Sequence, residues 1–300
     1  MKELIIRADA SPQMGTGHVM RCLALAQAWQ SHGGAVHFVM AQATPAIETR
    51  LREENVCIHG IDSTPGSQED AGQTAEYAHR QEADWVVVDG YHFGAAYQRR
   101  LKDEDCKVLF LDDYGHAKRY EADLVLNQNI DAEASLYADR GTDTKLLLGP
   151  KYVLLRNEFW PWRSPRRVPR KEVRRVLVTL GGADPDNITR RTVDALGQMS
   201  AENLHVTVVV GGSNPHLETV RAAAEQTDGP VEIQNDVENM AALMADSDVA
   251  ISAGGSTCWE LAFMGIPNVI VVLAENQRGI ARGLSASGVS FNTGAYNERT

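Results

Sequence analysis

Short apolar runs rich in valine, isoleucine and leucine alternate along the chain with longer segments whose apolar residues recur every three or four positions. The short runs predict buried strands, and the longer segments predict amphipathic helices. In the first half we expect strands at 4–7, 36–40, 56–61, 85–89, 108–111 and 124–127, and helices at 19–31, 46–54, 67–82 and 95–103. Strand and helix in turn predict a parallel sheet covered by helices.

A proline- and arginine-rich stretch interrupts this alternation. Residues 160–175 read WPWRSPRRVPRKEVRR, a composition that suits a solvated linker better than a core. The alternation then restarts, with strands expected at 175–180, 206–210, 231–233, 249–252, 269–273 and 289–292, and helices at 188–199, 217–225, 240–246, 257–264 and 277–287.

The pattern therefore predicts an N-terminal domain at 1–160, a linker at 161–174 and a C-terminal domain at 175–300. Each is expected to be a doubly wound, Rossmann-like α/β domain, and their strand ends are expected to face each other across a cleft. Because no helix follows the last expected strand, we expect the C-terminal domain to be unusually short or truncated.

The glycine-rich loop after the first expected strand carries an unusual histidine. Gly15, Thr16, Gly17 and His18 stand directly before the alanine-rich helix at 19–31. A histidine in the first turn of a helix lies at the positive end of the helix dipole, which disfavours its protonated form. His18 is therefore a candidate general base for water near neutral pH, and the alternative is a helix-capping or buried structural histidine.

The second half contains a further glycine pair between an expected strand and an expected helix. Gly254 and Gly255 precede Ser256 and Thr257, whose amides and hydroxyls form a candidate seat for a diphosphate. Glu260 follows on the same helical face, where its carboxylate can accept hydrogen bonds from ribose hydroxyls. The plainer alternative is a helix cap followed by a surface glutamate.

A second pair, Gly181 and Gly182, can present amides to the same phosphate. An ordinary strand–helix turn capped by Asp186 or Asn187 is compatible with that role. The first loop is not a dinucleotide fingerprint, because Met20 stands where the third glycine is required. The sequence also lacks the Gly-Lys-Ser/Thr of a P-loop, so neither NAD nor ATP is expected.

Charge and cysteine content narrow the class of partner. The formal net charge of -11 argues against nucleic acid, because proteins that bind it carry a basic face. The four cysteines contain no Cys-x-x-Cys pair, which predicts reduced, mostly buried thiols. No apolar stretch reaches the length of a membrane span or a signal-peptide core. We expect a cytoplasmic monomer without metal, cofactor or membrane partner.

Several motifs, taken in order, resemble one family. They are GTGH at 15–18, GGADPDN at 181–187, SAGGSTCWELAFMGIP at 252–267 and AENQ at 274–277. Together they resemble the UDP-sugar hydrolases of pseudaminic acid biosynthesis. They are more distantly similar to the lipid-linked N-acetylglucosaminyltransferase of peptidoglycan synthesis, whose GT-B fold has two Rossmann-like halves. The resemblance spans nearly the whole chain and implies a GT-B-like α/β fold.

The resemblance also implies a reaction. His18 would be the base that activates water for attack, with inversion, on the anomeric carbon of a UDP-linked 2,4-diacetamido-2,4,6-trideoxy-altropyranose, and UDP would leave. Holding the charge of the leaving diphosphate and deprotonating water are sufficient for this chemistry. The resemblance implies that Tyr91 holds the sugar, that the backbone of Ile233 faces uracil, and that Asn276 and Gln277 reach the sugar and phosphate.

The same resemblance assigns the diphosphate to the segment 254–257 and the ribose to Glu260. At the start of the chain, Arg7, Asp9 and Gly17 are further candidate substrate-binding residues. Arg7 and Asp9 either pair with each other for structure, or Asp9 orients His18 or the water.

Polar residues at other strand ends complete the candidates. Asp112 and Asp113 are expected to divide their roles, one capping a turn and one facing the cleft. His37, His92 and His116 are expected to lie in loops or on polar faces and to be solvated.

Three hypotheses of different kinds follow from these residues. The first is a hydrolase of a UDP-activated diacetamido-trideoxy sugar that acts through His18. The second is a GT-B glycosyltransferase that passes the sugar from UDP to a hydroxyl acceptor. The third is a non-catalytic binder of nucleotide sugars, which leaves the histidine between the glycines and the helix unexplained. The first is preferred because no helix with a membrane-binding face is evident in the first half.

Overall fold

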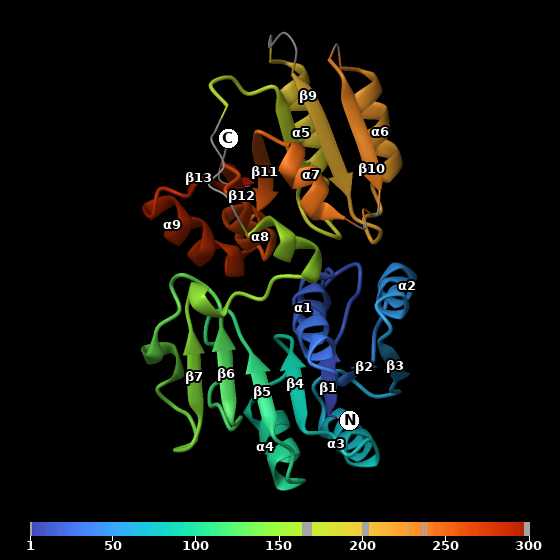
Figure 1. The fold of residues 1–300 in the computed structure, drawn as a ribbon, viewed down its shortest axis with the longest axis vertical. Helices are drawn as coiled ribbons and strands as arrows, with labels where there is room; N and C mark the ends of the chain where they lie inside the picture. The colour runs from blue at the N-terminus through green and yellow to red at the C-terminus, as the bar shows by residue number, and fades with distance from the viewer. Residues whose placement is uncertain are drawn as a thin grey trace. The chain divides into compact units, whose positions relative to one another are not determined.

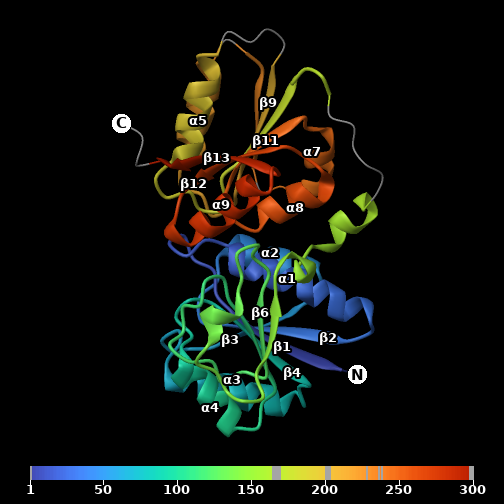
Figure 2. The ribbon, with the colours of Figure 1, turned by 90° about the vertical axis from the view of Figure 1, so that its left-hand side faces the viewer.

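The computed structural model describes residues 2–163, 170–199, 204–227, 229–235, 237 and 239–296. The chain divides into two compact units, Met1–Ser11 with His18–Arg156, and Pro12–Gly17 with Asn157–Thr300. Each unit is built on one parallel sheet with helices packed against it (Figure 1, Figure 2). The predicted α/β fold with two doubly wound halves is confirmed.

The first unit has a seven-stranded sheet in which every strand pair is parallel. Its strands are β1 (Glu3–Ala8), β2 (Ala35–Met40), β3 (Cys57–Gly60), β4 (Trp85–Asp89), β5 (Val108–Leu111), β6 (Leu124–Asn127) and β7 (Lys145–Leu148). Its helices are α1 (Gly17–Ser31), α2 (Pro45–Glu53), α3 (Gln68–Arg80) and α4 (Ala95–Asp103), with 3-10 turns at Ala134–Tyr137 and Pro150–Tyr152.

The strand order β3-β2-β1-β4-β5-β6-β7 reverses direction between β1 and β4. The sequence pattern does not predict β7, because its Leu-Leu-Leu run offers neither β-branched residues nor alternation with polar ones. Neighbouring strands run in the same direction, so all their carboxyl ends lie at one edge of the sheet (Figure 1).

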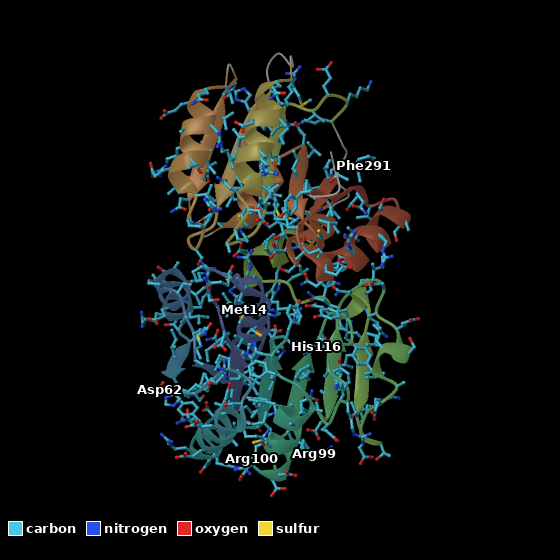
Figure 3. The ribbon with its side chains drawn as sticks, turned by 180° about the vertical axis from the view of Figure 1, so that it is seen from behind. Met14, Asp62, Arg99, Arg100, His116 and Phe291 are labelled. Carbon is cyan, nitrogen blue, oxygen red and sulfur yellow. The ribbon has the colours of Figure 1, made fainter. Side chains whose placement is uncertain are left out.

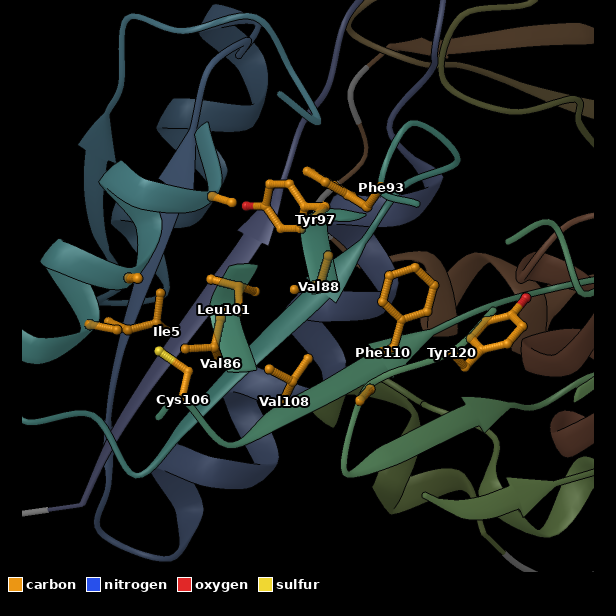
Figure 4. Close-up of a cluster of buried hydrophobic side chains, with 14 of the residues drawn as sticks. Ile5, Val86, Val88, Phe93, Tyr97, Leu101, Cys106, Val108, Phe110 and Tyr120 are labelled. Atoms are coloured by element: carbon orange, nitrogen blue, oxygen red, sulfur yellow. The ribbon is translucent and has the colours of Figure 1, made fainter. Parts of the chain in front are cut away.

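Both faces of this sheet are covered by apolar side chains. In β1, Ile5 belongs to the core that includes residues of α3 and α4, whereas Leu4 and Ile6 belong to the core with α1 and α2. This division follows from the alternation of side chains along a strand. Figure 4 shows the first core, in which Tyr97 and Leu101 of α4 pack near the sheet. Because both faces are buried, polar chemistry is left to the ends of the strands.

The second unit has a six-stranded parallel sheet in the order β10-β9-β8-β11-β12-β13. Its strands are β8 (Arg175–Thr179), β9 (His205–Val210), β10 (Val231–Asn235), β11 (Val249–Ala253), β12 (Asn268–Val272) and β13 (Ser290–Ala295). Its helices are α5 (Ile188–Gly197), α6 (Leu217–Glu225), α7 (Met240–Asp246), α8 (Thr257–Met264) and α9 (Arg278–Ala286), with 3-10 turns at Asn157–Trp162 and Glu275–Gln277.

The second unit takes in residues that precede the proline-rich stretch. Phe159 is fully buried in the core with residues of α7 and α8, and Glu158 Oε1 accepts a hydrogen bond from the Met240 amide at 3.0 Å. The longer segment of this unit therefore begins at Asn157, before the linker expected at 161–174. Residues 164–169 of that linker lie outside the described residues. None of the described helices is both long and apolar enough to cross a membrane.

Candidate active site

The carboxyl ends of β1 and β4 lie side by side where the strand order of the first unit reverses. In open α/β sheets this is the usual position of a ligand, because the loops that leave the two strands diverge there. β1 leads through a glycine-rich loop into α1, which begins at Gly17, and a Cβ at Gly17 would meet nothing within 4 Å. β4 ends at Asp89 and leads to Tyr91. The polar residues of these two connections form the candidate site.

His18 is the second residue of α1, and a carboxylate holds its imidazole. His18 Nδ1 lies 2.7 Å from Oδ1 of Asp89, which is fully buried. An ionised Asp89 accepts the hydrogen on Nδ1, so the lone pair resides on Nε2. Within the described residues, no hydrogen bond occupies Nε2. This tautomer can act as a general base.

Arg21, one turn along α1, binds the same carboxylate through two hydrogen bonds. Its Nε and Nη2 each donate to Asp89 at 2.6 Å, and the Cys22 thiol donates to Asp89 Oδ2 at 3.4 Å. Burial raises the pKa of Asp89, but the charges and hydrogen bonds of Arg21 and His18 together lower it by more, so it lies well below its ordinary value. Asp89 is therefore ionised at neutral pH.

Arg21 also connects the base to the loop that follows β5. Its Nη1 donates to Asp113 Oδ1 at 2.5 Å, and Asp113 Oδ2 accepts from the Tyr91 hydroxyl at 2.6 Å. The ring of Tyr91 in turn meets the His18 ring edge-on, with centroids 4.7 Å apart. Tyr91 is 36% exposed, so it forms part of the surface of the site.

Arg7 and Asp9 lie outside this arrangement. Both are fully buried, and Arg7 Nη1 lies 2.7 Å from Asp9 Oδ1 while Arg7 also donates twice to Asp70 of α3. His92, expected to be solvated, lies 3.5 Å from the second oxygen of Asp9. The structure thus favours the pairing alternative, and the idea that Asp9 orients the base is wrong because Asp89 does so. Complete burial corrects the expectation that Arg7 and Asp9 contact substrate.

A second imidazole–carboxylate pair lies at the end of β5. His116 Nδ1 is 2.6 Å from Asp112 Oδ1, and Asp112 Oδ2 accepts from the Gly115 amide and the Tyr120 hydroxyl, both at 2.8 Å. The expectation that one aspartate here caps a turn is confirmed for Asp112. His116 follows β5 in Figure 3, but it is not solvated, since its side chain is 8% exposed. His37 is likewise held between a glutamate and a tyrosine.

The predicted glycine pairs of the second unit follow β8 and β11, between which its strand order reverses. Gly181 has a φ of 96°, a conformation that glycine adopts without strain. A Cβ at Gly211 would lie 2.6 Å from Gly182 Cα, so the loops after β8 and β9 pack backbone against backbone. This close approach explains the glycine at 211, and a Cβ at Gly182 would collide with the Thr16 side chain. The phosphate role of Gly181 and Gly182 stays a prediction.

Gly254 and Gly255 differ in their surroundings. The Gly254 amide donates to Gln277 Oε1 at 3.2 Å, and the same oxygen accepts from the Leu273 amide at 2.9 Å. A Cβ at Gly254 would lie 2.9 Å from Gln277 Cβ, whereas one at Gly255 would meet nothing within 4 Å. Gln277 thus holds the loop after β11, whereas the space beside Gly255 is open.

The other expected binding residues of this unit lie as follows. Ser256 is the N-cap of α8 and makes no side-chain cap bond, and Thr257 is the first residue of the helix. Glu260 is in the first turn and is 8% exposed. Asn276 lies in the 3-10 turn after β12, and Ile233 lies in the middle of β10, at the edge of the sheet.

The sequence predicts roles for His18 and Tyr91, and these roles stay predictions; it does not assign the residues that connect the two. Asp89, Arg21 and Asp113 carry that connection, and of these three the sequence predicts a role for Asp113 alone. The one local signal is the spacing of His18 and Arg21, three positions apart on one helix face. Among the described residues, no group of three or more metal-ligating side chains is placed to hold a metal ion.

Solved structures define the class of fold. The chain superimposes on MurG of Acinetobacter baumannii with a TM-score of 0.60 and 20% identity, covering 98% of this chain and 86% of that one. It superimposes on Anabaena HepE, solved in complex with UDP-glucose, with a TM-score of 0.61 and 15% identity, covering 99% of this chain and 86% of that one. The fold is therefore that of the GT-B glycosyltransferases.

Sequence comparisons add particular relatives. Residues 175–290 match the glycosyltransferase family 28 C-terminal domain. The chain is 28% identical to the spore coat polysaccharide biosynthesis protein SpsG of Bacillus subtilis, over 96% of this chain and 83% of that protein. It is 23% identical to the UDP-2,4-diacetamido-2,4,6-trideoxy-beta-L-altropyranose hydrolase of Campylobacter jejuni, over 95% and 97%. Another relative, from Methanocaldococcus jannaschii, is 26% identical, and the chain spans 57% of its length.

Proposed function

We propose that the protein is an enzyme that acts on nucleotide sugars, and specifically that it hydrolyses a UDP-linked 2,4-diacetamido-2,4,6-trideoxy sugar in nonulosonic acid biosynthesis. The observation that carries this proposal is the His18–Asp89 pair, 2.7 Å apart at the strand-order reversal of the first unit. The similarity to a hydrolase of such a substrate over nearly the whole of both chains supports the choice of reaction.

The proposed step balances with water as the only co-reactant. His18 Nε2 takes one proton of water while the oxygen forms a bond to the anomeric carbon. The bond from that carbon to the phosphate oxygen breaks, and its electron pair leaves with UDP. Attack from the face opposite the leaving group inverts the configuration, and Asp89 stabilises the imidazolium that forms.

In the second unit, we propose that UDP binds at the open backbone beside Gly255 and the start of α8. The amides of Ser256 and Thr257 and the dipole of α8 favour a diphosphate there. Glu260 in the first turn would accept from the ribose, and the edge-strand backbone of Ile233 would face uracil. Gly181, Gly182 and Asn276 would complete the phosphate and sugar contacts.

A glycosyltransferase is the second candidate, because residues 175–290 match the family 28 C-terminal domain. A base that deprotonates water can equally deprotonate a sugar hydroxyl, so the residues of the first unit serve both reactions. The two functions differ in whether UDP is released when no acceptor other than water is present.

The test is acceptor-free incubation with the UDP-linked diacetamido sugar in ¹⁸O-water, with UDP and free sugar measured. We expect equal amounts of both, with ¹⁸O in the sugar alone. His18→Gln should lower the rate by about 10²–10⁴-fold, the usual contribution of a general base, while UDP affinity is retained. His32→Gln, at the exposed other end of α1, is the matched control.

Two outcomes would contradict the proposal. Release of UDP only after a hydroxyl acceptor is added would favour the transferase. A His18→Gln variant as active as His32→Gln would remove His18 as the base.

A further inference from the structure

Five side chains of the first unit form a closed ring of contacts around the candidate base. His18 contacts Asp89, Asp89 binds Arg21, Arg21 binds Asp113, and Asp113 accepts from Tyr91, with contacts between 2.5 and 2.7 Å. Tyr91 closes the ring by packing edge-on against His18. The ring brings together residues from α1, from the end of β4 and from the loops after β4 and β5, all within one compact unit.

We propose that Arg21 and Asp113 are positioning residues that set the charge balance beside His18 and so control how readily its imidazole accepts a proton. This inference rests on the proposed function, in which His18 is the base. It assigns to Arg21 and Asp113 an effect that acts through Asp89 and Tyr91 rather than by contact with the substrate.

Arg21 offsets the negative charge that Asp89 places beside His18. A buried carboxylate alone at Nδ1 would strongly favour the imidazolium, and a base that already holds a proton cannot take one from water. Arg21 binds both oxygens of Asp89 and places Nη2 3.4 Å from His18 Nδ1, which counters that effect. Its side chain is 8% exposed, so solvent screens these charges little.

Asp113 accepts a hydrogen bond from the same guanidinium. Asp89, Asp113 and Arg21 together carry a net charge of -1 beside a neutral His18. Loss of the Arg21 charge would leave -2, and loss of the Asp113 charge would leave 0. The two losses must therefore move the protonation of His18 in opposite directions, which damage to the fold alone would not do.

Other titratable groups of this unit lie near the ring, and each has its own partner. Cys22 donates to Asp89, the ring of Tyr114 packs 5.4 Å from Tyr91, and His116 lies 5.6 Å from Tyr91 and is bound to Asp112. Asn129 Nδ2 lies 3.3 Å from Asp113 Oδ1. Arg7, Asp9, Asp70 and His92 form a separate buried group. None of these supplies a second arginine to Asp89.

Tyr91 links the charge balance to the geometry of the site. Its hydroxyl is anchored by Asp113, and its ring lies against the imidazole that Asp89 orients. Removal of the hydroxyl in Tyr91→Phe keeps every formal charge of the ring. That variant therefore separates the positioning of the tyrosine from the charge balance.

The experiment is the pH profile of kcat/KM for UDP release by the full chain, together with an NMR titration of the His18 ring signal. In Arg21→Gln, the acid limb of the profile and the His18 titration should move to higher pH by about 1–3 units. In Asp113→Asn both should move to lower pH, Arg21→Lys should restore most of the wild-type profile, and Tyr91→Phe should leave the acid limb in place.

Matched controls are Arg99→Gln and Asp103→Asn on the exposed face of α4, where Arg99 is seen in Figure 3. Neither should move the profile. The inference would be overturned if Arg21→Gln and Asp113→Asn moved the pH profile in the same direction, or if neither variant moved it. If Arg21→Gln does not fold, Asp113→Asn alone tests the inference. A shift of the profile to lower pH supports it, and any other result overturns it. If the wild type releases no UDP, the proposed function fails, and the NMR titration still tests the charge balance.

Discussion

In the first unit, one imidazole–carboxylate pair lies at the end of β4 and another at the end of β5, and their partners decide which of these two imidazoles can act as a base. His116 has both ring nitrogens engaged, Nδ1 with Asp112 and Nε2 with the Phe93 carbonyl at 3.3 Å. Burial lowers the pKa of His116, but Asp112 and the Phe93 carbonyl raise it by more, so it lies above its ordinary value. The Nε2 of His18 carries no hydrogen bond among the described residues. Arg21 offsets the negative charge of Asp89, the carboxylate that contacts His18 Nδ1.

At this scale, we predict that His116 stabilises the fold in a pH-dependent way. Its folded pKa is raised, so its contribution is fully present below the unfolded value of about 6.5 and is lost as pH rises through the folded value. His116→Gln should cost about 1.5–3 kcal/mol at pH 6 and less at pH 9, measured by urea unfolding. His32→Gln, on an exposed residue, should show no such trend. An equal loss for His116→Gln at both pH values would contradict the prediction.

At the scale of elements, both units place most of their candidate residues where parallel strands end, in the loops that follow and in the first turn of the next helix. A strand and the loop after it can deliver a backbone amide or a side chain to the sheet edge without disturbing the core. In the loop after β11, the two glycines differ in their surroundings. Gly254 contacts Gln277 in the loop after β12, whereas Gly255 faces open space.

The two neighbouring glycines therefore predict different results for the same substitution. Gly254→Ala should lower the free energy of unfolding by about 1–3 kcal/mol, because its Cβ would lie 2.9 Å from Gln277 Cβ. Gly255→Ala should leave stability within about 0.5 kcal/mol but weaken UDP binding about tenfold, since its methyl group would occupy the proposed phosphate position. Calorimetric titration with UDP measures the second effect. Unchanged affinity in Gly255→Ala would place the diphosphate elsewhere.

At the scale of the whole molecule, each unit has buried cores of its own on both faces of its sheet. We predict two calorimetric transitions for the full chain. UDP at one hundred times its Kd should stabilise one of them by about 2.7 kcal/mol, or roughly 8 °C, and leave the other in place. Hydrogen exchange should assign the stabilised transition to residues after Asn157. Stabilisation of only the earlier residues would contradict the proposed UDP site.

The alternation of strands and helices, the parallel α/β class and the loop that carries His18 could be predicted from sequence, because they depend on local periodicity and on the conformational preferences of glycine. The four-residue strand β7 could not, because a run of leucines fits a buried helix as well as a strand. The glycine pairs were predicted as ligand seats, but only the packing around them separates Gly254 from Gly255.

The partners of His18 were decided by the tertiary structure alone. Asp89 is 71 positions from His18 and Asp113 is 92 positions from Arg21, and no local pattern encodes such pairings. They arise because β4 lies beside β1 and β5 beside β4, so that the loops after these strands meet at one edge. The same packing buried Arg7 and Asp9. These residues stand next to a loop in sequence, but α3 packs over them and supplies Asp70 to Arg7. Sequence by itself determined which residues leave the strands, and the order of the strands decided which of them meet.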